Sequence, residues 1–443
     1  MRRDLLLAFG VVLLVGPLMQ PWSAQPASRY LLTAAAVEHR TLELDAYDHL
    51  LGVDRAEYRG HTYSDKAPYQ PLLGVPFLET WEAAGGSGFP GPVGELTAEG
   101  LVDDDNRALW WVTLWTVTVP AALLAVVVRR LVSRTHPPLA YPVAVAMAVG
   151  TTLLPFSSLL FAHVLAALLL TLAWFLVREP GPSSGAVLLA GVCLGFAIGT
   201  EYAVAVVAAV VLVAVLLADG FIKGVWLSVG TVLGTLPLLL YNWLVFENPL
   251  EVSYQGHLGS FEGEGALGVY NLELPKLDEM YRALLSDKGL FVLTPVMLLA
   301  MGGCVLAIAE ASRIRRDAVV ALVSFGLLLL VTSGVDGLGG STPGPRYLIP
   351  VLPLFAIPLA EVWSRYPRLC IGATVFGFVW MWLATVTDAL ANQPQDWLRD
   401  LGDGDLVANV VTGHQHVSLA LLSAAAGLAL LALALRPPAK ALG

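Results

Sequence analysis

Apolar runs of about 20 residues recur along the whole chain, mostly separated by short polar segments. A helix needs about 20 consecutive apolar residues to cross a hydrocarbon core roughly 30 Å thick. The pattern therefore predicts an all-α polytopic membrane protein with about twelve transmembrane helices. The predicted spans are 5–24, 108–128, 139–156, 158–177, 185–200, 202–218, 225–246, 289–309, 318–333, 347–363, 369–391 and 417–435.

Composition supports the membrane assignment. Of the 443 residues, 56% are hydrophobic and only 14% are charged, and the mean hydropathy is +0.70. A soluble globular domain is usually about 45–50% apolar and about 25% charged. These values exclude a soluble protein, and we expect residues 1–443 to form one transmembrane domain.

The positions of Lys and Arg predict the orientation, because positively charged loops tend to stay in the cytoplasm. One alternating path through the spans puts every basic cluster on the same side, with both termini cytoplasmic in a plasma membrane. The opposite face is acidic, and we expect no nucleic-acid partner. The clusters are Arg2 with Arg3, Arg129 with Arg130 and Arg134, Arg313 with Arg315 and Arg316, Arg365 with Arg368, and Arg436 with Lys440.

Two predicted outer loops are long, 25–107 and 247–288, whereas the cytoplasmic loops are brief. Functional residues often lie on loops that a rigid scaffold holds, so we expect the active site on the outer face, with its catalytic residues in 25–107. Apolar and charged residues alternate in 28–51, which predicts amphipathic helices along the membrane surface.

Several ionisable residues lie where apolar surroundings make a charge costly unless it is paired or used. Each also has a structural explanation, such as a solvated helix face for Asp45 or an ordinary surface pair for Lys66. Glu201 is harder to explain in this way because it lies between two long apolar stretches. The candidates are Asp45, Asp54, Asp65, Lys66, Glu201 and Arg346.

Arg346 and Tyr347 follow a segment rich in glycine and proline, directly before a predicted span. A guanidinium there can grip a lipid phosphate through two parallel hydrogen bonds. An interfacial Arg-Tyr anchor explains the same residues equally well.

The order of short motifs resembles the GT-C superfamily of membrane glycosyltransferases, which includes protein O-mannosyltransferases and the aminoarabinose transferases of lipid A. The resemblance spans most of the chain. Its motifs are Asp54-Arg55-Ala56, Gly60-His61-Thr62-Tyr63-Ser64-Asp65-Lys66-Ala67-Pro68, Gly199-Thr200-Glu201-Tyr202, Leu240-Tyr241-Asn242, Phe246-Glu247-Asn248-Pro249, Leu284-Leu285-Ser286-Asp287-Lys288-Gly289-Leu290, Thr294-Pro295 and Gly344-Pro345-Arg346-Tyr347-Leu348.

The resemblance implies transfer of a hexose or pentose from a polyprenyl-phosphate donor to a glycan, lipid or protein acceptor on the extracytoplasmic face. It gives Asp45 the role of catalytic base in an inverting displacement. Lys66, Arg346 and Tyr347 would bind the donor phosphate within membrane lipid, although Ala67 departs from the Lys-Pro-Pro pattern of the aminoarabinose transferases. The remaining candidate site residues are Asp54, His61, Tyr63, Asp65 and Glu201.

Two questions stay open at this point. No paired-acid signature stands beside Asp45, where Ala46 follows, so the site has either no cofactor or a divalent cation. The alternative functions are a twelve-span secondary transporter, and a polymerase or ligase of cell-surface glycans. Against a transporter, the two halves show no repeat and the long acidic outer loops have no place in that architecture.

Overall fold

The structure is a computed structural model, and it describes residues 1–103, 106–179, 181–255, 257–258, 273–335, 340–391 and 393–436. Much of the predicted second outer loop therefore lies outside the described residues. The α-helices are α1 Arg2–Val15, α2 Ala24–Ala34, α3 Tyr69–Ala83, α4 Gly100–Asp103, α5 Arg107–Thr113, α6 Val119–Ser133, α7 Ala140–Val149, α8 Leu153–Phe156, α9 His163–Val177, α10 Ser184–Thr200, α11 Ala205–Asp219, α12 Phe221–Phe246, α13 Leu277–Leu285, α14 Leu290–Leu293, α15 Pro295–Ala309, α16 Arg315–Ser333, α17 Ala356–Arg365, α18 Pro367–Val386, α19 Pro394–Asp403 and α20 Val417–Leu435.

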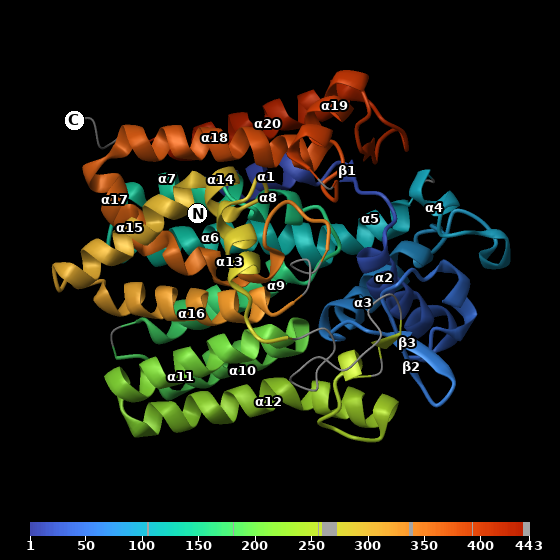
Figure 1. The fold of residues 1–443 in the computed structure, drawn as a ribbon, viewed down its shortest axis with the longest axis horizontal. Helices are drawn as coiled ribbons and strands as arrows, with labels where there is room; N and C mark the ends of the chain where they lie inside the picture. The colour runs from blue at the N-terminus through green and yellow to red at the C-terminus, as the bar shows by residue number, and fades with distance from the viewer. Residues whose placement is uncertain are drawn as a thin grey trace.

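The long helices run side by side as a bundle, horizontally in Figure 1. Helices α2, α3, α4 and α19 and the hairpin of β2 and β3 gather at its right-hand end, and the turns that join α11 to α12 and α15 to α16 lie at its left-hand end. The strands are short: β1 Leu18–Met19 pairs with β5 Ala408–Asn409, and β2 Arg55–Tyr58 pairs with both β3 His61–Ser64 and β4 His257–Leu258.

The described residues contain seven helical segments that are long and apolar enough to cross a membrane, or eight if the pair 277–293 and 295–309, bent by 97°, is one span. The protein is therefore a multi-pass helical membrane protein. Four of the twelve predicted spans fall on shorter helices, namely α1, α7 with α8, α9 and α10. The third span is split because α7 ends before Gly150-Thr151-Thr152, where polar residues replace the apolar run.

Helices α10 and α12 approach each other closely because glycines meet at their interface. A Cβ atom added at Gly195 would lie 2.3 Å from the carbonyl oxygen of Thr231, and one added at Gly234 would lie 2.4 Å from that of Val192. Small residues allow helix backbones to pack in a membrane, where apolar side chains gain little by leaving lipid. This contact holds α10, whose C-cap residue is Glu201, against α12.

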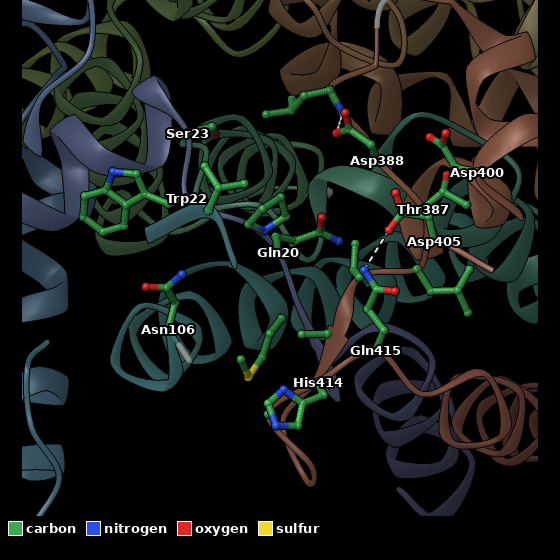
Figure 2. A pocket seen from close by; sticks show the side chains of 18 residues that line it. Gln20, Trp22, Ser23, Asn106, Thr387, Asp388, Asp400, Asp405, His414 and Gln415 are labelled. Carbon is green, nitrogen blue, oxygen red and sulfur yellow. Dashed lines mark hydrogen bonds between the residues drawn. The ribbon is translucent and has the colours of Figure 1, made fainter. Parts of the chain in front are cut away.

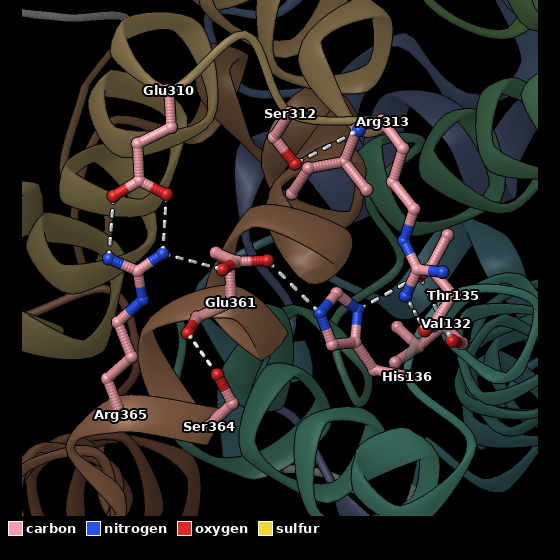
Figure 3. Close-up of polar contacts among 10 residues, drawn as sticks. Val132, Thr135, His136, Glu310, Ser312, Arg313, Glu361, Ser364 and Arg365 are labelled. Carbon is pink, nitrogen blue, oxygen red and sulfur yellow. Dashed lines mark hydrogen bonds and ion pairs between the residues drawn. The ribbon is translucent and has the colours of Figure 1, made fainter.

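Residues predicted to be cytoplasmic contact one another across helices at the end of the bundle opposite the hairpin. Arg365 forms ion pairs with Glu310 at 2.6 Å and Glu361 at 3.0 Å, and Glu361 also pairs with His136 at 3.2 Å (Figure 3). The guanidinium of Arg313 donates to the carbonyl oxygen of Thr135 at 2.6 Å. These loops therefore lie on one side of the bundle, as the alternating path requires.

The segment 28–51 does not form the expected amphipathic surface helices. Helix α2 buries every residue from Pro26 to Ala34, a π-helical turn follows at Ala35–His39, and the chain breaks at Arg40, where φ is +53°. A 3-10 helix then covers Asp45–Leu50. The polar side chains of this segment therefore belong to a folded cap and not to one helix lying on lipid.

Candidate functional site

A β-hairpin places the predicted site residues of the first outer loop. Arg59 and Gly60 form its two-residue turn with φ values of +54° and +83°, a backbone suited to the twist of antiparallel strands. The chain enters at Asp54 and leaves at Asp65 and Lys66. The two ends of the hairpin are neighbours, so residues that are distant in sequence meet there.

Lys66 is the centre of a buried charge cluster. Its Nζ atom lies 3.0 Å from Asp54 Oδ1 and 2.6 Å from Asp65 Oδ2, and its side chain is only 3% exposed. Asp65 also accepts a hydrogen bond from Ser28 Oγ at 3.1 Å. A buried ammonium needs such partners because removing an unpaired charge from water is very costly.

Arg346 reaches the same cluster from the other half of the chain. It begins the 3-10 helix Arg346–Phe355, directly after the turn at Gly344, where φ is +104°. Its side chain lies near the charge of Asp54 and over the ring of Phe161, 5.6 Å from the ring centre. Nη2 donates to the hydroxyl of Tyr347 at 3.2 Å.

Arg346 is 6% exposed, and its Nε atom has no hydrogen-bond partner among the described residues. Buried N–H groups in folded proteins are nearly always hydrogen-bonded to protein or water. An unused guanidinium donor in a polar site is therefore suited to an anionic ligand.

Two members of the cluster, Arg29 and His163, were not among the sequence-based candidates. Arg29 lies in α2, and its guanidinium lies 5.7 Å from the centre of the Phe161 ring. Its Nε atom also has no hydrogen-bond partner in the described part of the chain. His163 begins α9, and its Nδ1 atom lies 3.2 Å from Glu201 Oε2. For His163 the signal was a single ionisable residue inside an apolar run, the same signal that singled out Glu201. Arg29 lies in the predicted outer loop and carries no such signal.

Asp45 and His61 lie outside this cluster, on the outer side of the hairpin. The side chain of Asp45 is 47% exposed; it accepts a hydrogen bond from the N–H of Thr62 at 2.7 Å, and His61 Nδ1 lies 2.7 Å from its other oxygen. Partial burial acts to raise the pKa of the Asp45 carboxyl, but the two hydrogen-bond donors outweigh it and lower this pKa. The sequence-based candidates thus separate into two groups.

The exposed group can hold a metal ion. Ligand atoms of Glu43, Asp45 and His61 all lie within 4.8 Å of one another, and carboxylate with imidazole suits several divalent cations. Tyr63 lies beside this exposed group, since its hydroxyl is hydrogen-bonded to Glu43, and its ring packs on Phe246 with ring centres 6.1 Å apart.

We use the term buried cluster for eight residues. Two are Arg29 and His163, and six are sequence-based candidates, namely Asp54, Asp65, Lys66, Glu201, Arg346 and Tyr347. Its halves are joined by ring contacts, since Tyr347 lies 5.6 Å from His163 between ring centres. Three cations meet three carboxylates in it, and the Nε atoms of two of the cations, Arg29 and Arg346, have no hydrogen-bond partner among the described residues. These donors are suited to an anionic ligand at the end of the bundle that carries the hairpin.

Comparison with solved structures finds the same fold in ArnT. ArnT from Cupriavidus metallidurans bound to undecaprenyl phosphate matches with a TM-score of 0.52 and 13% identity, over 97% of this chain and 76% of that one. ArnT in the apo state matches with a TM-score of 0.50 and 14% identity, over 97% and 74%. The Archaeoglobus fulgidus oligosaccharyltransferase in the apo form gives a TM-score of 0.49 and 12% identity, over 98% and 55%.

No protein-family model matches the sequence, and no curated protein sequence matches it. The similarity to ArnT extends over almost the whole chain, at an identity too low to show more than the arrangement of the helices. The protein therefore has the fold of ArnT.

Proposed function

We propose that the protein is a glycosyltransferase that moves a sugar from a polyprenyl-phosphate donor to an acceptor on the extracytoplasmic face of the membrane. The observation that carries the proposal is the buried guanidinium of Arg346, which lies near the charge of Asp54 and whose Nε atom has no hydrogen-bond partner among the described residues. The donor class is supported by the shared fold, since one matching ArnT structure is bound to undecaprenyl phosphate.

In this proposal Arg346, Lys66 and Arg29 bind the donor phosphate and stabilise the charge that develops on it when the sugar leaves. Fixed cations in a site that excludes water act more strongly than they would in bulk solvent. Tyr347 orients the guanidinium through its hydroxyl. A polyprenyl phosphate leaves readily, so the remaining requirement is a carboxylate for the acceptor hydroxyl.

Two carboxylates compete for the role of base. The sequence-based candidate is Asp45, but hydrogen-bond donors occupy both of its oxygens on the outer side of the hairpin. We favour Asp54, because it contacts Lys66 and lies near Arg346, where the anomeric carbon would be. Direct attack by one acceptor hydroxyl would invert that carbon.

The twelve-span path with both termini in the cytoplasm belongs to the same proposal. It is supported by the ion pairs among residues of the predicted cytoplasmic loops (Figure 3), which lie at the end of the bundle opposite the hairpin. The active site is then extracytoplasmic. If a divalent cation takes part, Glu43, Asp45 and His61 would hold it.

The proposal is tested by donor turnover in proteoliposomes. The wild type is given a panel of polyprenyl-phosphate hexoses and pentoses with an envelope glycan extract, and released polyprenyl phosphate is measured by mass spectrometry. We expect turnover of at least one donor, and its loss in Arg346→Met. A control variant, Arg40→Met, removes an arginine that is paired with Glu79 on the surface. Turnover that is equal in both variants and the wild type would contradict the proposal.

A further inference from the structure

A polar cavity lies at the outer end of the bundle, apart from the buried cluster. Its volume is about 670 Å³, within the range of ligand sites. Its walls come from the link between α1 and α2, the segment after α18, helix α19 and the residues before α20 (Figure 2). No residue of the buried cluster lines it.

The cavity is rich in hydrogen-bond acceptors. Asp388, Asp400 and Asp405 lie together on one side of it in Figure 2, and His414 is the only basic residue among those that line it. Such a wall repels an anion and favours a ligand that offers N–H or O–H groups. The ligand therefore carries several donors and no negative charge.

The side chain of Gln20 is an independent observation that points to a ligand site. It lies at the centre of the cavity wall in Figure 2 and is only 8% exposed. Its Nε2 atom donates to Ser158 Oγ at 2.9 Å and to the carbonyl oxygen of Thr385 at 3.0 Å. These bonds fix the amide, yet Oε1 has no hydrogen-bond partner among the described residues.

A smaller cavity of about 270 Å³ adjoins the first one. Trp22 and Asn106 line both cavities, and the smaller one adds the aromatic side chains of Tyr30, Trp81 and Phe89. It also adds Arg107, whose Nε atom donates to the carbonyl oxygen of Val410 at 3.3 Å. Flat apolar rings offer surface to the C–H faces of a ligand, while carboxylates and amides bind its hydroxyl groups. This combination, extended over two adjoining cavities, fits a chain of sugars.

A bound metal ion does not explain these carboxylates. Within the described residues, ligand groups close enough to share an ion occur at Glu43, Asp45 and His61, and not in this cavity. The acceptors are instead spread over a space that is large enough for more than one sugar ring.

We propose that the two cavities form a binding site for a neutral or amine-bearing oligosaccharide. Gln20 and the three aspartates accept hydrogen bonds from its hydroxyl or amino groups, and Trp22 contacts a ring face. Identifying this oligosaccharide as the acceptor of transfer rests on the proposed glycosyltransferase function. Binding of the sugar does not rest on it.

The test is saturation-transfer difference NMR on the full-length protein in detergent, with three disaccharides of similar size. The probes are cellobiose, the disaccharide of glucosamine, and cellobiouronic acid. We expect saturation transfer to the first two and at least fivefold less to the acid. Gln20→Met and Asp405→Asn should each reduce the signal of the bound sugars at least fivefold. Asp403→Asn is the control for Asp405→Asn. It removes the same charge from the last residue of α19, which is exposed and does not line the cavity, and it should leave the signal unchanged.

The proposal would be overturned if none of the three sugars bound, if the acid bound as well as cellobiose, or if both cavity variants bound like the wild type. Thermal unfolding of each variant checks that it is folded. Retained polyprenyl phosphate is measured in the same samples. If the wild type binds none of the sugars but retains the lipid, only this inference is contradicted. If the wild type binds sugar but retains no polyprenyl lipid, the proposed donor is contradicted and this inference stands.

Discussion

Lys66 Nζ lies 3.0 Å from Asp54 Oδ1, and this ion pair closes the base of the β2–β3 hairpin. Both side chains are largely buried, at 3% and 15% exposure. This one contact therefore supports the fold of the hairpin and also fixes the positions of Asp54 and Lys66, the two residues that we place nearest the reacting bond. Stability and function are coupled at this point.

Replacing Lys66 by Met should lower the free energy of unfolding by about 3–5 kcal/mol, because it leaves two buried carboxylates without their ammonium partner. The measurement is thermal or denaturant unfolding in detergent. Arg55→Met is the matched control, since it breaks the exposed pair with Asp48 and should cost less than about 1 kcal/mol. Equal losses in the two variants would show that the Lys66 pairs do not support the cap.

Asp54→Asn should reduce sugar transfer by about 10²–10⁴-fold, the usual contribution of a general base. Asp45→Asn should retain most of the activity if Asp54 is the base. Initial rates of the two variants decide between them. The reverse order of effects would return the role to Asp45, as the sequence resemblance suggests.

The contact between His61 and Asp45 should appear in the titration of His61. Its hydrogen bond with Asp45, together with the charges of Glu43 and Asp45, raises the pKa of His61 above its ordinary value. The contact therefore contributes stability that is fully present below pH about 6.5. This contribution is lost as the pH rises through the pKa in the folded state. NMR of His61 should show a higher pKa in the wild type than in Asp45→Asn, and no difference would contradict the contact.

Gly195→Leu should destabilise the packing of α10 against α12 by at least about 1–3 kcal/mol, since overpacked interfaces must shift their backbones. Any Cβ atom there meets the backbone of Thr231 at 2.3 Å. Gly302→Leu in α15 is a control, because a Cβ atom at Gly302 has no neighbour within 4 Å. The unfolding temperatures should differ clearly, and similar values would argue against the close contact.

The hydropathy pattern predicted the class of fold because a membrane span needs a long apolar run. It also predicted a short span at 185–200, where α10 covers Ser184–Thr200. The predicted span 158–177 began five residues too early, because α9 covers only His163–Val177. Lys66, Glu201 and Arg346 stood out as charges in apolar surroundings, and the structure brings them together. The separate position of Asp45 depends on tertiary pairing, in which the N–H of Leu44 donates to the carbonyl oxygen of Thr62. Local sequence does not reveal such a pairing.

Mass spectrometry of the lipids that copurify with the protein in mild detergent tests the central claim most directly. The wild type is compared with the double variant Lys66→Ala, Arg346→Ala and with Arg40→Ala, which removes a surface cation. We predict that a polyprenyl-phosphate sugar or polyprenyl phosphate copurifies with the wild type and with Arg40→Ala, and is lost from the double variant. If all three proteins retain only bulk phospholipid, or if the double variant retains the polyprenyl lipid in full, the buried cluster is not a donor phosphate site.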